Sequence, residues 1–130
     1  MKILIGFCLL LLATAQSFAR TDVYGLHLFF NEKEFVDVLT LEYHEGVDVI
    51  KGGHMDVPND FDGPIINPVA FSGQLRFDLF VPKNSSRPKD LVFDYRAFFF
   101  DETRNQMYGY VTLKGSDEFV ASFVAFKREG

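Results

Sequence analysis

The densest group of side chains able to do chemistry lies in one short stretch, which holds His54, Asp56, Asp60 and Asp62. Imidazole nitrogens and carboxylate oxygens are common ligands for metal ions. The run Asp60–Gly63 resembles the start of a calcium loop, but Phe71 stands where an EF-hand needs a bidentate glutamate, so an EF-hand is excluded. Asp, Asn, Gly and Pro are also the ordinary residues of turns. We therefore predict no metal site, and a metal-dependent enzyme is the least favoured function.

Other motifs of catalysis or cofactor binding are missing from the sequence. His27, His44 and His54 have neither of the close spacings, H-x-x-x-H or H-x-H, of a zinc-binding pair. The sequence contains no G-x-S-x-G, no serine with an evident base and no glycine-rich phosphate cradle before a helix. We therefore predict no catalytic residue and no cofactor, and we expect that the protein is not an enzyme.

Residues 1–19 have the pattern of a secretory signal peptide. Lys2 gives a positive start, an apolar run follows, and Ser17 and Ala19 place small residues where a signal peptidase requires them. The apolar run is shorter than the roughly 20 residues that a membrane span needs. We expect cleavage after Ala19, with Ala15 as the second choice, and a secreted or periplasmic protein without membrane insertion.

Residues 20–130 are predicted to form a single acidic domain without cysteine. Cys8 lies in the signal peptide and outside any lipoprotein box, so the domain can form no disulfide. Of 16 phenylalanines, 14 remain without Phe7 and Phe18, and their burial must stabilise the fold. Without Lys2, 12 basic residues face 18 acidic ones, a net charge of −6. This charge disfavours nucleic acid and anionic lipid as partners.

Segments of alternating apolar and polar residues follow one another with turn residues between them, and seven or eight strands are expected. Such spacing is typical of an all-β antiparallel domain. Asn31 and Glu34 predict a helical turn at most between the first two segments. The clearest expected strands cover residues 23–30, 36–44, 47–51, 71–81, 91–100, 107–114 and 119–126.

The segment Gly52–Pro68 is predicted to be the longest irregular part of the chain. Its three glycines and three prolines argue against a central strand or a helix. Long loops in compact domains are usually functional or disordered. The sequence leaves three roles open for this segment, namely a lid over one end of the domain, a metal site or a disordered stretch.

The basic residues are scattered, and the nearest approach to a cluster is Lys83, Arg87 and Lys89. They stand among prolines and serines, which predicts a solvated loop and not a docking patch. Asn84 in the same stretch begins a glycosylation sequon, which matters only in a eukaryote.

The order of the expected strands suits an eight-stranded up-and-down barrel, and a two-sheet β-sandwich is the alternative. Aromatic residues alternate with Ala or Gly on the presumed inner faces, as in Phe119, Ala121, Phe123 and Ala125. The space beside the small residues is either a ligand cavity or filled by neighbouring rings, and the close packing of protein cores favours filling. The overall pattern resembles small secreted calycin-like barrels.

Two functions follow from this pattern, and the oligomeric state stays open. The first is a non-catalytic protein that holds a small apolar ligand in the barrel mouth. Its expected contacts are Phe71, Phe77, Tyr95, Phe99, Phe119 and Phe123. The second is a protein–protein interaction module, because aromatic residues dominate interface cores. It would use the loop described above and four rings from the presumed outer face, Phe98, Phe100, Tyr108 and Tyr110.

Overall fold

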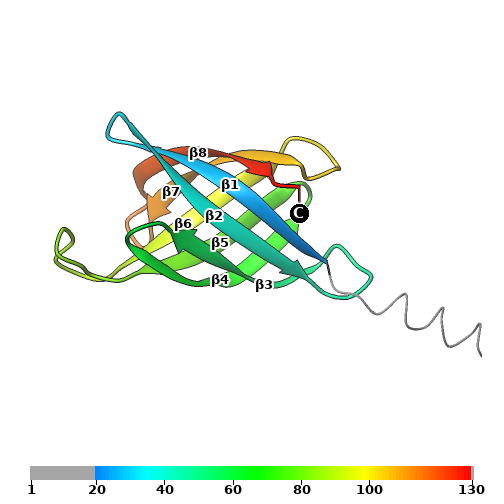
Figure 1. Ribbon diagram of the computed structural model, residues 1–130, viewed down its shortest axis with the longest axis horizontal. Helices are drawn as coiled ribbons and strands as arrows, with labels where there is room; N and C mark the ends of the chain where they lie inside the picture. The colour runs from blue at the N-terminus through cyan, green and yellow to red at the C-terminus, as the bar shows by residue number, and fades with distance from the viewer. Residues whose placement is uncertain (1–19, 130) are drawn as a thin grey trace, which may run out of the picture.

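The computed structural model describes residues 20–129, and these form a closed barrel of eight antiparallel strands (Figure 1). The strands are β1 (Thr21–Phe30), β2 (Lys33–Tyr43), β3 (Ile50–Val57), β4 (Phe61–Phe71), β5 (Gln74–Val81), β6 (Leu91–Phe99), β7 (Gln106–Leu113) and β8 (Glu118–Lys127). Each strand pairs with the next, and β8 pairs with β1. The predicted up-and-down barrel is confirmed, and the sandwich alternative is wrong.

The predicted signal peptide, residues 1–19, falls outside the residues that the structure describes. Within residues 20–129, a search for a helix long and apolar enough to cross a bilayer found none.

Period-two alternation determines which side chains each strand buries. In β5, Leu75, Phe77 and Leu79 face the interior and are at most 2% exposed. Arg76 and Phe80 point outward from the same strand and are exposed. A barrel has one interior, so the inward side chains of all eight strands form a single core.

The connection between β1 and β2 is a tight hairpin turn and contains no helical turn. Asn31 and Glu32 have φ angles of 55° and 64°, and Phe30 pairs directly with Lys33. Two consecutive residues with positive φ are typical of the two-residue hairpin loops that match strand twist. The helical turn predicted at this point is therefore wrong.

The segment Gly52–Pro68 is mostly strand, so the prediction of a long irregular loop is wrong. It contains most of β3, a three-residue turn at 58–60 and most of β4. The strand predicted at 47–51 is also placed too early in the chain, because β3 begins at Ile50 and ends at Val57.

Barrel packing explains why this strand pair contains glycine and proline. A Cβ on Gly53 would come within 2.3 Å of the Thr40 carbonyl oxygen and 2.9 Å of the Ile65 side chain. Pro64 forms the last pair with β3 and precedes the first pair of β4 with β5. Pro68 lies in the irregular part of the β4–β5 pairing. Both prolines stand where regular pairing is interrupted, and strands accept proline there.

Phe71, which was predicted to face the interior, is 75% exposed. The chain reverses at Ser72 and Gly73, whose φ angles of 50° and 77° lie in the left-handed region that favours glycine. Phe71 therefore ends β4 and pairs with Gln74 across the turn. The predicted strand at 71–81 is divided by this turn into the end of β4 and all of β5.

Phe119, also predicted to face inward, is 64% exposed because β8 contains a bulge. Val111 pairs with Ala121, but the next residue, Thr112, pairs with Phe119. The pairing skips Val120, which lines the barrel cavity in place of Phe119. A bulge inserts one residue and so reverses the alternation on one side of it.

Three aromatic rings fill the middle of the barrel. Phe77 stacks on Tyr95 with ring centres 4.8 Å apart, and Phe123 lies 5.8 Å from Tyr95. Ala97 and Gly109 lie opposite each other in the β6–β7 pairing. A Cβ on Gly109 would come within 2.0 Å of a backbone oxygen of β6, so the strands approach too closely for a larger residue.

Phe77→Ala should lower the free energy of unfolding by about 3–5 kcal/mol, because it removes a buried, stacked ring and leaves a cavity. Phe119→Ala deletes the same side chain from an exposed position and should cost about 0.5 kcal/mol or less. Urea unfolding followed by circular dichroism measures both values. Equal costs for the two variants would show that the inward and outward registers are assigned wrongly.

Candidate functional site: a cavity in the open half of the barrel

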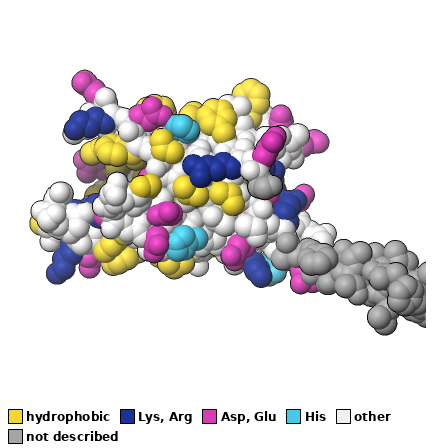
Figure 2. All heavy atoms as spheres, in the orientation of Figure 1, with side chains coloured by type: hydrophobic (Ala, Val, Ile, Leu, Met, Phe, Trp, Pro, Cys, Tyr) yellow, Lys and Arg dark blue, Asp and Glu magenta, His cyan; other side chains and the backbone are white. Residues whose placement is uncertain are grey.

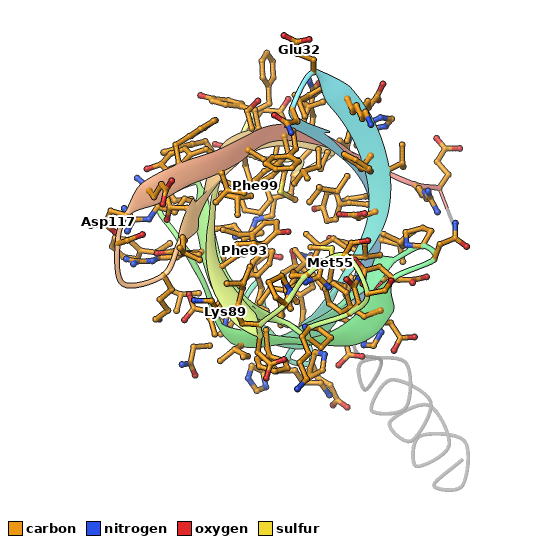
Figure 3. The ribbon with its side chains drawn as sticks, turned by 90° about the vertical axis from the view of Figure 1, so that its left-hand side faces the viewer. Glu32, Met55, Lys89, Phe93, Phe99 and Asp117 are labelled. Atoms are coloured by element: carbon orange, nitrogen blue, oxygen red, sulfur yellow. The ribbon has the colours of Figure 1, made fainter. Side chains whose placement is uncertain are left out.

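A cavity of about 810 Å³ opens at the barrel end that carries the β1–β2, β3–β4 and β5–β6 connections. Figure 3 looks into this end, where Glu32, Lys89 and Asp117 mark three of the surrounding turns. Phe93 and Met55 point into the barrel interior from opposite sides. The volume falls within the range of small-molecule sites in proteins.

The walls of the cavity are mainly apolar and come from the open-end halves of the strands. The apolar residues that line it include Leu28, Phe35, Phe61, Leu79, Phe93 and Val120. At the rim, Phe30 and Phe35 are 44% and 45% exposed. Apolar rings that are half open to water at the mouth of a cavity lose that exposure when an apolar ligand covers them.

Tyr95 marks the boundary between the cavity and the packed half of the barrel. Its side chain lines the cavity, while Phe77 and Phe123, which contact its ring, do not. Burial and the nearby charge of Asp37 raise the pKa of the Tyr95 hydroxyl above its usual value. Tyr95 therefore keeps its proton and offers a neutral hydroxyl near the floor of the cavity.

Asp37 is the charged residue set most deeply in the cavity wall. It is only 4% exposed and points inward from β2, opposite Leu26 of β1. Burial, followed by the like charges of Asp56 and Asp60, raises its pKa from 3.8 to about 6. Within the described residues no hydrogen bond or cation offsets these effects. The cavity therefore holds an acid whose charged form is poorly stabilised.

A polar contact joins two of the turns at the cavity rim. Arg87 of the β5–β6 loop donates two hydrogen bonds to Asp60 of the β3–β4 turn, at 3.2 and 3.0 Å. Asn84 donates a third to the same carboxylate at 3.0 Å. These bonds lower the pKa of Asp60. The predicted solvated loop is confirmed, because residues 83–86 and 88–90 are exposed, but Arg87 itself is tied to the rim.

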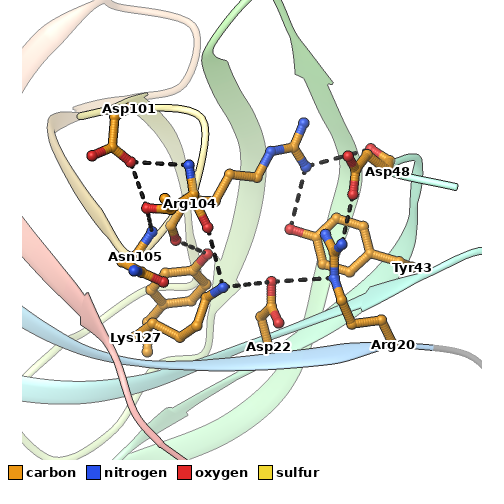
Figure 4. A network of polar contacts seen from close by, with 10 residues as sticks. Arg20, Asp22, Tyr43, Asp48, Asp101, Arg104, Asn105 and Lys127 are labelled. Atoms are coloured by element: carbon orange, nitrogen blue, oxygen red, sulfur yellow. Dashed lines mark hydrogen bonds and ion pairs between the residues drawn. The ribbon is translucent and has the colours of Figure 1, made fainter.

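The opposite end of the barrel is closed by side chains around Arg104 (Figure 4). The Arg104 guanidinium lies 4.9 Å from the ring centre of Phe99 and 5.7 Å from that of Tyr43. It donates to the Tyr43 hydroxyl and to the Asp48 carbonyl, both at 3.4 Å. The Tyr24 hydroxyl donates to the Arg104 carbonyl at 2.7 Å. A cation over aromatic faces is favourable, so these contacts hold the Arg104 side chain across this end of the barrel.

Salt bridges beside the Arg104 side chain join the two ends of the described chain. Asp22 of β1 lies 3.5 Å from Arg20 and 3.6 Å from Lys127 of β8. Arg20 also pairs with Asp48 at 2.6 Å and lies over the Tyr43 ring at 3.9 Å. The pairing of β1 with β8 is thus reinforced by charge at the closed end.

The six residues predicted to contact a ligand fall into three groups. Tyr95 alone lines the cavity. Phe77 and Phe123 are buried in the packed half, and Phe99 lies beneath Arg104 at the closed end. Phe71 and Phe119 lie on the outside, which corrects their assignment to the interior.

None of the four rings predicted on the outer face is fully buried. We call Phe98, Phe100, Tyr108 and Tyr110 the outer aromatic surface. Phe100 is 68% and Tyr108 50% exposed, while Phe98 and Tyr110 are half-buried. Phe98 and Tyr108 stack with ring centres 5.7 Å apart. The view in Figure 2 shows hydrophobic side chains along the upper edge of the barrel, among charged ones.

The predicted chemical cluster at residues 54–62 is spread over the outside of β3 and β4. Asp56 and Asp62 pair across these strands and are exposed, as is His54. Asp60 is held by Arg87 at the turn. In residues 20–129, no group of three or more His, Cys, Asp or Glu side chains is placed to hold a metal ion.

Sequence analysis missed most of the cavity wall, including Asp37. The alternation Phe35, Leu39, Leu41 and Tyr43 already defined an inward face of this strand. Asp37 occupies the same face, and an acid within an apolar face is the signal that could have identified it.

Comparisons with protein-family models, with curated proteins and with solved structures found no match. The cavity, its rim and Asp37 are therefore the basis on which a function is assigned.

Asp37→Asn should stabilise the protein at neutral pH by up to about 3 kcal/mol. A pKa raised on folding means that the charged form costs stability, so the wild type loses stability as pH rises from about 4 through about 6. The variant should match the wild type near pH 3 and exceed it increasingly up to pH 7. Urea unfolding across this range measures the difference.

The control is Asp62→Asn, which removes an exposed carboxylate and should show a much smaller dependence on pH. Equal behaviour of the two variants would contradict the burial of an unpaired Asp37.

Proposed function

We propose that this protein is a secreted or periplasmic, non-catalytic binding protein that holds a small ligand with an apolar body in the open half of its barrel. The observation that carries this proposal is the apolar cavity of about 810 Å³ above the packed aromatic layer. The pattern of residues 1–19 supports the location.

The chemistry of the cavity favours binding over catalysis. Its lining includes neither histidine nor cysteine, and its one serine, Ser86, is exposed at the rim. Asp37 and Tyr95 are placed to orient a ligand, whereas acid–base catalysis usually needs a second group with a complementary pKa.

Val120→Trp should weaken binding of N-phenylnaphthylamine, a neutral dye whose fluorescence rises in apolar surroundings. Val120 lines the cavity from β8, and an indole there occupies space that the dye needs. We expect the dissociation constant to rise at least about tenfold, in line with the sensitivity of apolar pockets to added bulk. Fluorescence titration gives the constants.

Ser122→Trp is the matched control, because Ser122 is exposed on the outside of the same strand. It should leave dye binding unchanged. Circular dichroism checks that both variants fold. Failure of the wild type to bind the dye, or equal binding by both variants, would contradict a ligand site in this cavity.

A second candidate function is docking of another protein on the outer aromatic surface. The observation that favours it is the stacking of half-buried Phe98 on exposed Tyr108, since rigid aromatic side chains often anchor interfaces. The first partner to test is a second copy of this chain.

Tyr108→Ser should change the free energy of unfolding by about 0.5 kcal/mol or less, because the ring is half exposed. If a second copy docks there, the variant should also weaken self-association in sedimentation velocity. A wild type that stays monomeric at all concentrations would exclude a second copy as the partner.

A further inference from the structure

Asp37 occupies a position where an apolar residue would suit the surroundings. It is 4% exposed, pairs with Leu26 and stands between Phe35 and Leu39 along the inner face of β2. Burying an unpaired carboxylate is costly, and proteins normally pair such groups. The acid therefore needs a partner that the described part of the chain does not supply.

The charged groups around Asp37 make the inner cavity negative. Asp56 and Asp60 act on it with like charge. Two cations, Lys33 and Arg87, line the mouth, but Lys33 is exposed and Arg87 is bound to Asp60. The remaining ionisable neighbour, Tyr95, is neutral near physiological pH. A positively charged group inside the cavity would be attracted by Asp37 and by the acids near it.

We propose that the ligand is a protonated amine with an apolar body, and that its ammonium group pairs with Asp37. This inference rests on the proposed function and adds to it the chemical class of the ligand and the residue that selects it. The apolar body would lie against the aromatic and aliphatic walls, toward the rim rings Phe30 and Phe35.

The cavity offers an ammonium group more than one kind of contact. The Asp37 carboxylate accepts charge-assisted hydrogen bonds, which are stronger than neutral ones. Tyr95 lines the same space, and its hydroxyl oxygen is a further acceptor. Phe93 also lines this space, and aromatic rings attract cations. A buried ion pair is favourable only when such additional contacts offset desolvation, and this wall provides them.

An anionic ligand would fit this cavity poorly. A carboxylate placed at the floor would face Asp37, and one at the rim would compete with Asp60 for Arg87. A neutral ligand would gain the apolar contacts but leave the charge of Asp37 without a partner. The order of affinity expected for one apolar chain is therefore amine, then alcohol, then carboxylate.

The test is displacement of N-phenylnaphthylamine from the protein by octylamine, octanol and octanoate at pH 7.5, which carry the same alkyl chain. Octylamine should bind at least about tenfold more tightly than octanol, the equivalent of one charge-assisted hydrogen bond. In Asp37→Asn this preference should disappear while octanol binding is retained. Asp56→Asn, which removes an exposed carboxylate on the outer face of β3, should keep most of the preference.

The same displacement between pH 8 and pH 5 provides a second readout. Octylamine stays protonated throughout, while the pKa of Asp37 near 6 means that the carboxylate is lost over this range. The other charged groups near Asp37 are Asp56, Asp60 and Lys33, and Asp60 stays charged because its hydrogen bonds to Arg87 lower its pKa. Amine affinity should therefore decrease in the wild type as the pH is lowered from 8 to 5, and it should stay constant in Asp37→Asn.

Each other outcome has a distinct meaning. If the dye does not bind at all, the proposed function itself fails. If the dye binds but octylamine is no better than octanol, the cavity function stands and the amine inference is wrong. If octylamine is preferred equally by the wild type and Asp37→Asn, the amine is held elsewhere, and the role of Asp37 is overturned.

Discussion

Closure of the sheet through the pairing of β8 with β1 is the constraint on which the rest of this structure depends. Closure removes free strand edges and fixes one interior that eight inward faces must fill. The described chain contains no cysteine, so this filling, together with the salt bridges beside Asp22, must hold the barrel together. Pairing between strands, including that of β1 with β8, therefore decides where each side chain lies.

The interior is filled unevenly, so the barrel has a packed half and an open half. Phe77, Tyr95 and Phe123 form a dense layer, and Arg104 seals the far end over Phe99. Above Tyr95 the side chains do not reach across, and a cavity remains. The closed half is therefore packed, while the open half leaves the space in which we propose that a ligand binds.

Sequence analysis predicted the barrel because local alternation and short turns identify hairpins. It misplaced features that depend on contacts between strands. Gly53 looked like a loop residue, yet the backbone oxygen of Thr40 on the paired strand β2 leaves no room for a Cβ there. Phe119 followed the alternation of its neighbours, but a bulge that depends on pairing with β7 turned it outward. Phe71 was assigned to the strand after it, although the turn at Ser72 separates them.

The site was harder to predict than the fold, because a cavity is defined by the space that side chains leave empty. Six aromatic residues suggested ligand contacts, but three of them pack against one another and only Tyr95 lines the cavity. Other residues, such as Leu28, Phe93 and Val120, surround the empty volume. Asp37 differs from these, since its charge within an apolar face is visible in the sequence. A buried acid that lowers stability at neutral pH has no structural benefit in the free protein. In the proposed function, a cationic ligand that pairs with Asp37 offsets this cost, so the position of Asp37 would connect the stability of the barrel to the occupancy of its cavity.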